Sequence, residues 1–345
     1  MRTDDLRSYY PEELAVLIEA LGEKKFRAKQ LFEWMHAKQA SSYDAMTNLP
    51  GAFRTMLAEK FPLVTLKIKT VQESKADGTR KYLFELPDGQ MIESVFMVYH
   101  HGNTVCISSQ AGCRMGCRFC ASAIGGFVRN LEPSEMLEQV YRIMEDTGER
   151  ISNIVIMGTG EPLDNYENVM RFLRLVSHPA GLSLSRRNLT LSTCGIVPRI
   201  YDLAEEDIPV TLAVSLHAPN DEKRKALMPV ANKYTIREIT DACRSYFKKT
   251  GRRITFEYAL VSGENDSAAD AAELALHLRG LPCHVNLIPV NPVRERTFKR
   301  PDKKGILNFQ NQLEKCGINV TIRREMGSDI DGACGQLRKR YTFGD

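Results

Sequence analysis

The segment that decides the fold is Cys113-Arg114-Met115-Gly116-Cys117-Arg118-Phe119-Cys120, which spaces three cysteines as CxxxCxxC. Thiolates are soft ligands suited to iron–sulfur clusters or zinc, and most such sites are completed by a fourth protein ligand. Three cysteines without an evident fourth ligand indicate an open metal position at which another molecule binds. The alternative is a zinc knuckle that is completed by His100, His101 or Cys106.

The sequence around this motif has the rhythm of repeated βα units. Apolar, β-rich runs are each followed by a segment of helical period, and they lie at residues 104–108, 154–157, 189–192, 210–215, 254–261 and 285–290. In one such segment Leu137, Val140, Tyr141 and Met144 fall at i, i+3, i+4 and i+7. The pattern predicts an α/β fold with buried parallel strands, in a partial barrel or an open sheet. In either arrangement polar residues at the carboxyl ends of the strands line the active site.

Four regions are expected along the chain. Residues 1–62 form a small helical accessory domain, 63–99 a β connector, 100–292 the βα barrel and 293–345 a basic C-terminal extension. The first region interleaves basic and aromatic residues from Lys24 to Trp34. That pattern suits either nucleic-acid binding or an amphipathic helix with a solvated basic face.

The composition, with 43% hydrophobic and 26% charged residues, excludes a disordered chain and favours a large core. No run approaches the roughly 18 apolar residues of a membrane helix. Met1 to Asp5 lacks the apolar stretch of a signal peptide, so we expect a cytoplasmic protein without membrane contact. Nine cysteines are too sparse for a disulfide scaffold.

The formal charge of +4 is concentrated in the tail, where residues 293–345 hold twelve Lys and Arg against seven Asp and Glu. Arg294 to Lys304 form its densest part. Further basic residues are Arg323, Arg324, Arg338, Lys339 and Arg340. A charge run usually marks a solvated face, but next to a site that must accept a nucleobase it favours contact with RNA phosphates.

A second motif, Gly158-Thr159-Gly160-Glu161-Pro162, follows the second predicted barrel strand. Together with the three cysteines it resembles the radical S-adenosylmethionine (SAM) superfamily. The resemblance implies that Cys113, Cys117 and Cys120 hold a [4Fe–4S] cluster whose open iron binds the amino and carboxylate groups of SAM. It also implies a partial (βα)6 barrel.

Further segments resemble the RlmN/Cfr family of adenosine methyltransferases over nearly the whole length. They are Val105 to Gln110, Arg129-Asn130-Leu131-Glu132, Leu191-Ser192-Thr193, Ser215-Leu216-His217-Ala218-Pro219 and Gly332 to Leu337, with Phe26 to Trp34 and Met46 to Pro50 in the first region. The resemblance implies that Gly160, Glu161, Ser192, Ser215, Leu216, His217 and Asn291 bind SAM. The unassigned cysteines, Cys194, Cys243, Cys283 and Cys316, are interpreted as packing residues.

In the family, a cysteine near the C-terminus is methylated by one SAM molecule, and that cysteine matches Cys334. A 5′-deoxyadenosyl radical from a second SAM takes hydrogen from the methyl group, and the carbon radical adds to adenine. A second thiol, matching Cys106, then releases the RNA by forming a transient disulfide with Cys334. Glu93 matches the proposed acceptor of the adenine proton, although at its position a solvent-facing glutamate is the ordinary interpretation.

The resemblance therefore implies methyl transfer to C2 of an adenosine in 23S rRNA and of the adenosine beside a tRNA anticodon. C2 has no lone pair that attacks a sulfonium methyl group, so radical chemistry is needed. A flavodoxin- or ferredoxin-type electron donor and a thiol reductant are the implied partners. Two alternatives stay open: a Cfr-like enzyme that methylates C8, and a non-catalytic RNA-binding protein stabilised by zinc.

Overall fold

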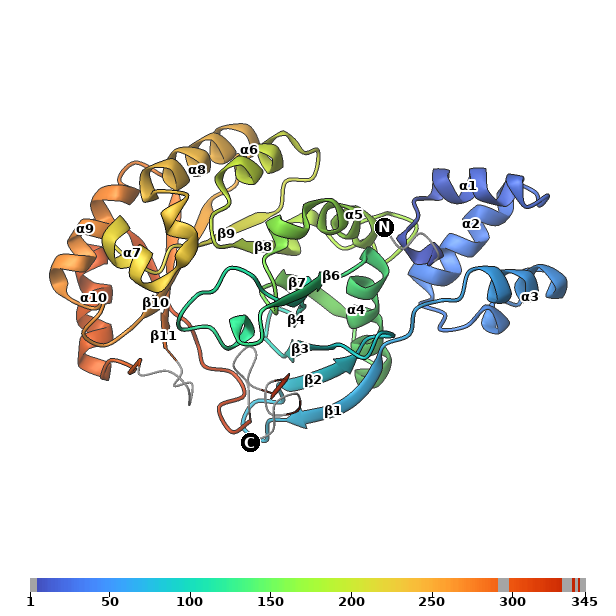
Figure 1. Cartoon of the computed structure of the whole chain (residues 1–345), viewed down its shortest axis with the longest axis horizontal. Helices are drawn as coiled ribbons and strands as arrows, with labels where there is room; N and C mark the ends of the chain where they lie inside the picture. Colours follow the sequence, from blue (N-terminus) through green and yellow to red (C-terminus); the bar gives the residue numbers. More distant parts are fainter. Residues whose placement is uncertain (1–4, 291–297, 331–336, 339–340, 342–345) are drawn as a thin grey trace.

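The computed structural model describes residues 5–290, 298–330, 337, 338 and 341. Its main feature is one ten-stranded sheet in the order β1-β2-β3-β4-β7-β8-β9-β10-β11-β12 (Figure 1). The strands are β1 (Lys67–Glu73), β2 (Arg80–Glu85), β3 (Met91–Met97), β4 (Asn103–Cys106), β7 (Ile151–Ile156), β8 (Leu189–Thr193), β9 (Thr211–Ser215), β10 (Ile254–Leu260), β11 (Cys283–Pro289) and β12 (Asn319–Ile322). A separate hairpin joins β5 (Gln110–Gly112) to β6 (Phe127–Asn130).

In the main sheet β4, β7, β8, β9, β10, β11 and β12 are parallel and alternate with helices, so the expected partial (βα)6 barrel is confirmed. The helices are α4 (Pro133–Thr147), α5 (Tyr166–Val176), α6 (Val197–Glu205), α7 (Asp221–Leu227), α8 (Ile236–Thr250), α9 (Ala268–Leu278) and α10 (Lys303–Lys315). Shorter helical turns lie at Leu6–Ser8, Glu33–Ala37, Tyr43–Ala45, Ala121–Ala123, Pro162–Asn165, Arg186–Asn188 and Pro229–Asn232. No helix in the described part of the chain is both long and apolar enough to cross a membrane.

Local sequence explains where the long helices begin and end. Pro133 occupies the first turn of α4, where its missing N–H costs nothing, and Gly148 ends the helix in the left-handed conformation. The stripe of Leu137, Val140 and Tyr141 is buried as its spacing predicts. In α8 the Thr235 hydroxyl accepts from the Glu238 N–H while the Glu238 carboxylate accepts from the Thr235 N–H, which is a capping box.

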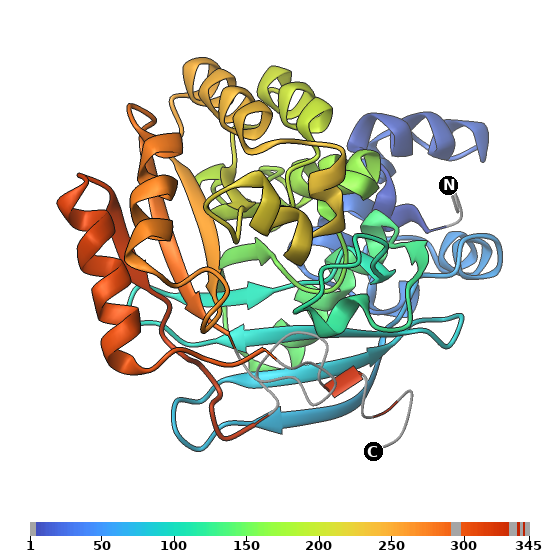
Figure 2. The same ribbon diagram turned by 60° about the vertical axis from the view of Figure 1, so that its left-hand side comes forward.

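Two parts of the sheet differ from the expectation. β12 adds a seventh parallel strand, which the sequence did not reveal because its residues are mostly exposed and show no apolar alternation. The connector strands β1 to β3 continue the same sheet in antiparallel fashion, with β3 paired to β4 through Val95 and Cys106. Figure 2 shows these strands crossing the lower part of the molecule, while α10, in red, lies at the left. The connector thus forms one wall beside the barrel.

The N-terminal helices α1 (Pro11–Ala20), α2 (Phe26–Phe32) and α3 (Gly51–Lys60) form a separate module at the right of Figure 1. The fully buried Arg7 joins this module to the barrel. Its Nη1 donates to Glu138 Oε1 of α4 at 2.6 Å and to the Val64 carbonyl at 2.7 Å, and Nη2 donates to the Ala40 carbonyl at 2.8 Å. The module is therefore docked by a desolvated ion pair as well as by apolar packing.

Replacing Arg7 by methionine should lower the free energy of unfolding by about 3 to 5 kcal/mol, because the buried Glu138 carboxylate would lose its main cationic partner. Guanidinium denaturation of the full chain measures this loss. Lys29→Ala, which removes an exposed i,i+4 pair with Glu33, should change stability by no more than about 0.5 kcal/mol. Equal effects of the two substitutions would contradict the importance of the buried pair.

Candidate active site

The carboxyl ends of the parallel strands surround a cavity of about 540 Å³. The sequence-predicted site residues in its wall are Cys106, Cys113, Cys117, Cys120, Gly160, Glu161, Ser192, Ser215 and His217. Leu216 is fully buried beside the cavity, and Glu93 is buried in the neighbouring strand β3. Asn291 and Cys334 lie outside the described residues. Side chains from distant parts of the chain are thus gathered at one edge of the sheet.

The three cysteines of the CxxxCxxC motif lie in the loop that the β5–β6 hairpin closes. The Cys113 N–H donates to the Gly126 carbonyl at 3.0 Å, and the Cys120 N–H donates to the Cys117 carbonyl at 3.1 Å. Burial raises the pKa of Cys113 to about 12, so binding a metal here would displace a proton. Among the described residues, no three His, Cys, Asp or Glu side chains are already close enough to hold a metal ion. Three soft thiols on one cavity wall nevertheless match the donors that an iron–sulfur cluster requires.

The glycine-rich segment after β7 lies directly against this hairpin. The Thr159 carbonyl accepts from the N–H groups of Ser109 and Gln110 at 2.9 and 3.1 Å. Gly160 has φ of +113°, and a Cβ there would lie 2.7 Å from the Gln110 Cβ. Position 160 therefore requires glycine, both for its backbone conformation and for the close approach.

Glu161 ties the ends of two strands together. Its Oε1 accepts from the Leu163 N–H at 3.0 Å and its Oε2 accepts from the Cys194 N–H at 2.7 Å. Desolvation raises the pKa of this buried carboxyl group, while the backbone N–H groups of Cys194 and Leu163 oppose the shift. The loop after β7 is thereby fixed to the loop after β8.

His217 follows β9 with φ of +58°, a conformation that is uncommon outside glycine. Asn265 stabilises it by donating to the His217 carbonyl at 2.8 Å, and the Ala259 N–H donates to Nδ1 at 2.8 Å. Burial lowers the His217 pKa to about 3, so the ring is neutral and carries its proton on Nε2. The ring also meets Phe119 of the cysteine loop edge-on at 4.9 Å.

Two polar residues of this region escaped the sequence analysis. Asn265 is fully buried and lies in the turn after β10, where its side chain satisfies three backbone groups. Glu257 lines the cavity and accepts from Asn286 Nδ2 at 2.8 Å, and desolvation raises its pKa. A glutamate inside the apolar run of β10 was the available signal, because a buried strand accommodates a carboxylate only at a cost.

Glu93 is buried, which contradicts the solvent-facing interpretation of its position. Its Oε2 pairs with the buried Lys81 Nζ at 3.0 Å, and its Oε1 accepts from the Arg338 N–H at 2.6 Å. Arg338 is also buried and does not belong to the basic surface that we expected, because this contact draws the tail inward. The Glu93 carboxylate therefore binds the backbone at Arg338, which follows residues 331–336 in the sequence.

The chain before that segment is anchored as well. The Gly327 N–H donates to Asp77 Oδ2 at 2.9 Å, and Asp329 accepts from the Ser74 hydroxyl at 2.5 Å and from the Lys75 N–H at 2.9 Å. The turn between β1 and β2 therefore holds residues 327–329 against the connector strands. Gly327, Ser328 and Ile330 line the cavity.

The remaining thiols separate into three environments. Cys106 at the end of β4 is buried between the cavity and the apolar residues Val95 and Met97. Cys243 and Cys283 are in the core, as expected, whereas Cys194 is buried in the cavity wall. Cys316 is exposed and is not a packing residue, because it lies at the solvent-facing end of α10. Cys113, Cys117, Cys194, Cys243, Cys283 and Cys316 are free thiols.

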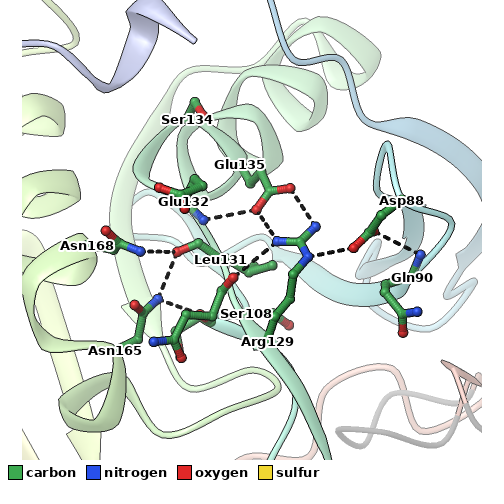
Figure 3. Close-up of polar contacts among 12 residues, drawn as sticks. Asp88, Gln90, Ser108, Arg129, Leu131, Glu132, Ser134, Glu135, Asn165 and Asn168 are labelled. Carbon is green, nitrogen blue, oxygen red and sulfur yellow. Dashed lines mark hydrogen bonds and ion pairs between the residues drawn. The ribbon is translucent and has the colours of Figure 1, made fainter. Parts of the chain in front are cut away.

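Arg129 anchors the hairpin that carries the cysteine loop (Figure 3). Its two Nη atoms form a fork with Glu135 of α4 at 2.7 and 2.8 Å, and Nε donates to Asp88 at 2.6 Å. The guanidinium holds the pKa of Asp88 below its ordinary value. Nearby, the Leu131 carbonyl accepts from Asn165 and Asn168, which fixes β6 to the start of α5.

Arg129→Lys should lower the free energy of unfolding by about 1.5 to 3 kcal/mol, because lysine cannot form the fork with the buried Glu135. Thermal and denaturant unfolding measure the change. Arg199→Lys offers a matched control, since Arg199 is paired with Asp202 at 3.0 Å on the surface and should cost less than about 1 kcal/mol. A larger loss at Arg199 than at Arg129 would refute this view of the hairpin.

Comparison with known proteins agrees with this architecture. Residues 107–275 match the radical SAM superfamily, and residues 5–63 match the ribosomal RNA large subunit methyltransferase N-terminal domain. A probable dual-specificity RNA methyltransferase RlmN of Lachnospira eligens is 59% identical over 98% of this chain and 96% of its own. A protein of the same name from Clostridioides difficile is 52% identical over 97% and 98%. The crystal structure of a radical SAM methyltransferase from Sphaerobacter thermophilus covers 96% of this chain and 98% of its own, with 46% identity and a TM-score of 0.92.

A partial βα barrel with a CxxxCxxC loop at the carboxyl ends of its strands defines a radical SAM enzyme, whose cofactors are a [4Fe–4S] cluster and SAM. The chain belongs to the RlmN family of radical SAM RNA methyltransferases. The resemblance seen in the sequence is therefore confirmed. The comparisons lend no support to a zinc-stabilised binding protein without catalytic activity.

Proposed function

We propose that this enzyme transfers a methyl group to C2 of an adenosine in 23S rRNA and of the adenosine beside a tRNA anticodon. The relatives are named dual-specificity RNA methyltransferases, which supports two RNA substrates. The observation that carries the proposal is the anchoring of the tail at Gly327 and Arg338, on either side of the segment with Cys334. One anchor is Asp77 in the turn between β1 and β2, and the other is Glu93 on β3, the strand that pairs with the strand of Cys106.

In this proposal Cys113, Cys117 and Cys120 hold the cluster, which when reduced supplies the electron that cleaves SAM to a 5′-deoxyadenosyl radical. The residues that would bind SAM are Gly160, Glu161, Ser192, Ser215, Leu216, His217 and Asn291. Of these, Gly160, Glu161, Ser192, Ser215 and His217 line the cavity. The Glu161 carboxylate already accepts hydrogen bonds from two backbone N–H groups. Its contribution is therefore to hold the loop after β7 in the conformation that receives the cofactor. The neutral His217 offers Nε2–H as a donor towards the cavity.

Cys334 carries the methyl group as a thioether and becomes bonded to the RNA base. Cys106 then attacks the sulfur of Cys334 and frees the methylated base, which leaves a disulfide between the two cysteines for a thiol reductant to reduce. The position of Cys106 in the cavity wall supports this role, since the tail residues Gly327 and Ile330 line the same cavity. Only a transient disulfide is proposed.

Glu93 accepts the proton from C2. Its carboxylate is desolvated and its charge is balanced by Lys81, so it is oriented without being exposed to bulk water. Its other oxygen holds the Arg338 N–H. The same carboxylate would thus position the tail and receive the proton at the site where the base is modified.

The RNA is held by positive charge around the cavity. Arg300, Arg323 and Arg324 lie in the cavity wall, although Arg300 is paired with Glu325 at 3.0 Å. The exposed Phe26 beside the basic residues of α2 offers a second contact surface in the N-terminal module. We infer that the adenine is turned out of its stack to reach the cavity, as for other enzymes that act on a base.

A flavodoxin- or ferredoxin-type donor supplies the electrons, and we place the enzyme in the cytoplasm with its RNA substrates.

The position of methylation is the first test. Mass spectrometry of nucleosides from 23S rRNA and tRNA should detect 2-methyladenosine in cells that contain the protein and lose it in cells that lack it. Restoring the gene should restore the nucleoside in both RNAs. If only 8-methyladenosine depends on the protein, the enzyme belongs with the Cfr-like alternative and the C2 assignment is wrong.

Substitution of the two proposed cysteines should arrest the reaction at different points. Cys334→Ala should form no methylated RNA while it still assembles the cluster, because the methyl acceptor is missing. Cys106→Ala should instead accumulate protein bonded to RNA, which persists on a denaturing gel, because the releasing thiol is missing. Absorption spectra and radiolabelled RNA measure the two outcomes.

Cys316→Ala is the matched control, since Cys316 is exposed and does not line the described cavity. It should methylate RNA at the rate of the unmodified enzyme. Turnover by Cys334→Ala would rule out the thioether route, and release of product by Cys106→Ala would rule out the assigned role of Cys106.

A further inference from the structure

Arg224 of α7 is a fully buried arginine next to the cysteine loop. Its three bonding nitrogens all donate to backbone carbonyls: Nε to Leu216 at 3.2 Å, Nη1 to Tyr234 at 3.2 Å and Nη2 to Cys194 at 2.6 Å. No carboxylate of the described residues is within ion-pair distance of this guanidinium. Arg7, the other fully buried arginine described above, has Glu138 as its partner.

A buried guanidinium without a counter-ion is costly, because carbonyl dipoles replace only part of its hydration. Desolvation accordingly lowers the pKa of Arg224, and the groups whose charged forms oppose the shift are Cys194, Cys117 and Asp221. Burial raises the pKa of both thiols, so they are neutral unless a metal displaces their protons. Asp221 accepts from the Ile236 N–H and caps the next helix. An anion on the side of the cysteines would offset the cost of burying this charge.

The segment that contains Arg224 packs against the cysteine loop. The Arg118 N–H donates to the Leu227 carbonyl at 2.9 Å, and Leu227 and Met228 pack against Met115, Cys117 and Phe119. Through Leu216 and Cys194, the guanidinium also holds the loops after β9 and β8. One side chain thus connects the proposed cluster site with both strand ends of the proposed SAM site.

The charge of a cluster at this place supplies the missing anion. A [4Fe–4S] cluster of charge two plus with three thiolate ligands has one net negative charge, and one-electron reduction adds a second. A fixed cation in a medium of low polarity stabilises the more negative state more strongly. Removal of the cation therefore makes reduction harder, even if the cluster is still bound.

We propose that Arg224 is a positioning residue that raises the reduction potential of the cluster by placing a buried positive charge beside Cys117. Its hydrogen bonds fix the loops after β8 and β9, and its charge favours the electron transfer that starts the reaction. The inference rests on the proposed cluster site. It goes beyond that proposal by assigning the reducibility of the cluster to a residue that is not a ligand.

The test is a redox titration of the reconstituted full-length enzyme, followed by electron paramagnetic resonance of the reduced cluster. Arg224→Met and Arg224→Gln remove the charge, and we expect the equilibrium constant for reduction to fall at least tenfold, which equals about 59 mV for one electron. Arg224→Lys keeps the charge but not the three carbonyl bonds, and should shift the potential by less than half as much. The Gln variant decides the matter if the Met variant does not fold.

Arg7→Met is the matched control, because it removes a buried arginine far along the chain from the cysteine loop and should lower stability without moving the potential. Equal shifts in the Met, Gln and Lys variants, or no shift in any of them, would overturn the proposal. Loss of the cluster from Arg224→Met and Arg224→Gln but not from Arg224→Lys would support the proposal, since the oxidised cluster is already anionic and needs the charge. Loss of the cluster from all three variants would count against the proposal.

Failure of the cluster assignment gives a different result. Cys117→Ala should lose the cluster altogether. Retention of the cluster by Cys117→Ala would show that the proposed ligands are wrong, independently of the potentials in the Arg224 series. Measuring the affinity for SAM separates the two roles of Arg224. Loss of its hydrogen bonds should loosen the loops and weaken SAM binding in all three variants, whereas the reduction potential should change mainly in the two variants that lose the charge.

Discussion

The backbone of Gly160 lies so close to Gln110 that the two segments leave no room for a side chain at position 160. This approach joins the loop after β7 to the hairpin that carries the three cysteines. Glu161, the next residue, extends the connection to the loop after β8 through the Cys194 N–H. Arg224 binds the carbonyl of the same Cys194 and extends it to the loop after β9. The carboxyl ends of four consecutive barrel strands are therefore one connected polar unit, and the cavity owes its shape to it.

The antiparallel strands β1 to β3 have a different part in the architecture. They are not βα units, yet they continue the barrel sheet and bring Glu93 next to the strand of Cys106. Lys81 on β2 balances the Glu93 charge, and the turn after β1 holds Asp329. Residues 63–99, which connect two regions in the sequence, therefore form one wall of the candidate active site in the folded protein. The barrel supplies the proposed cofactor positions, and the connector supplies the contacts with the tail.

Buried parallel strands and the cysteine motif could be predicted because their signals are local: apolar runs of strand length and a fixed spacing of ligands. β12 could not, since its four residues are stabilised by pairing with β11 and not by their own pattern. Glu93 and Arg338 meet across 245 positions, which no local pattern reveals. Arg224 lies in the charged run Asp221 to Lys225, typical of an exposed helix, and only the tertiary fold buries it. The resemblance to a family supplied the proposed roles, but not these contacts.

The contacts of Asp329 and Arg338 fix the described chain to the β1–β2 turn and to β3, on both sides of residues 331–336 in the sequence. Six residues separate Ile330 from Leu337, and a fully extended chain covers these seven steps in at most about 25 Å. With the role proposed for Cys334, a connection this short would give its thiol a high effective concentration at the cavity without a separate binding step. The proposed methyl carrier would then return to the same place in every turnover, because the chain is held on both sides of it.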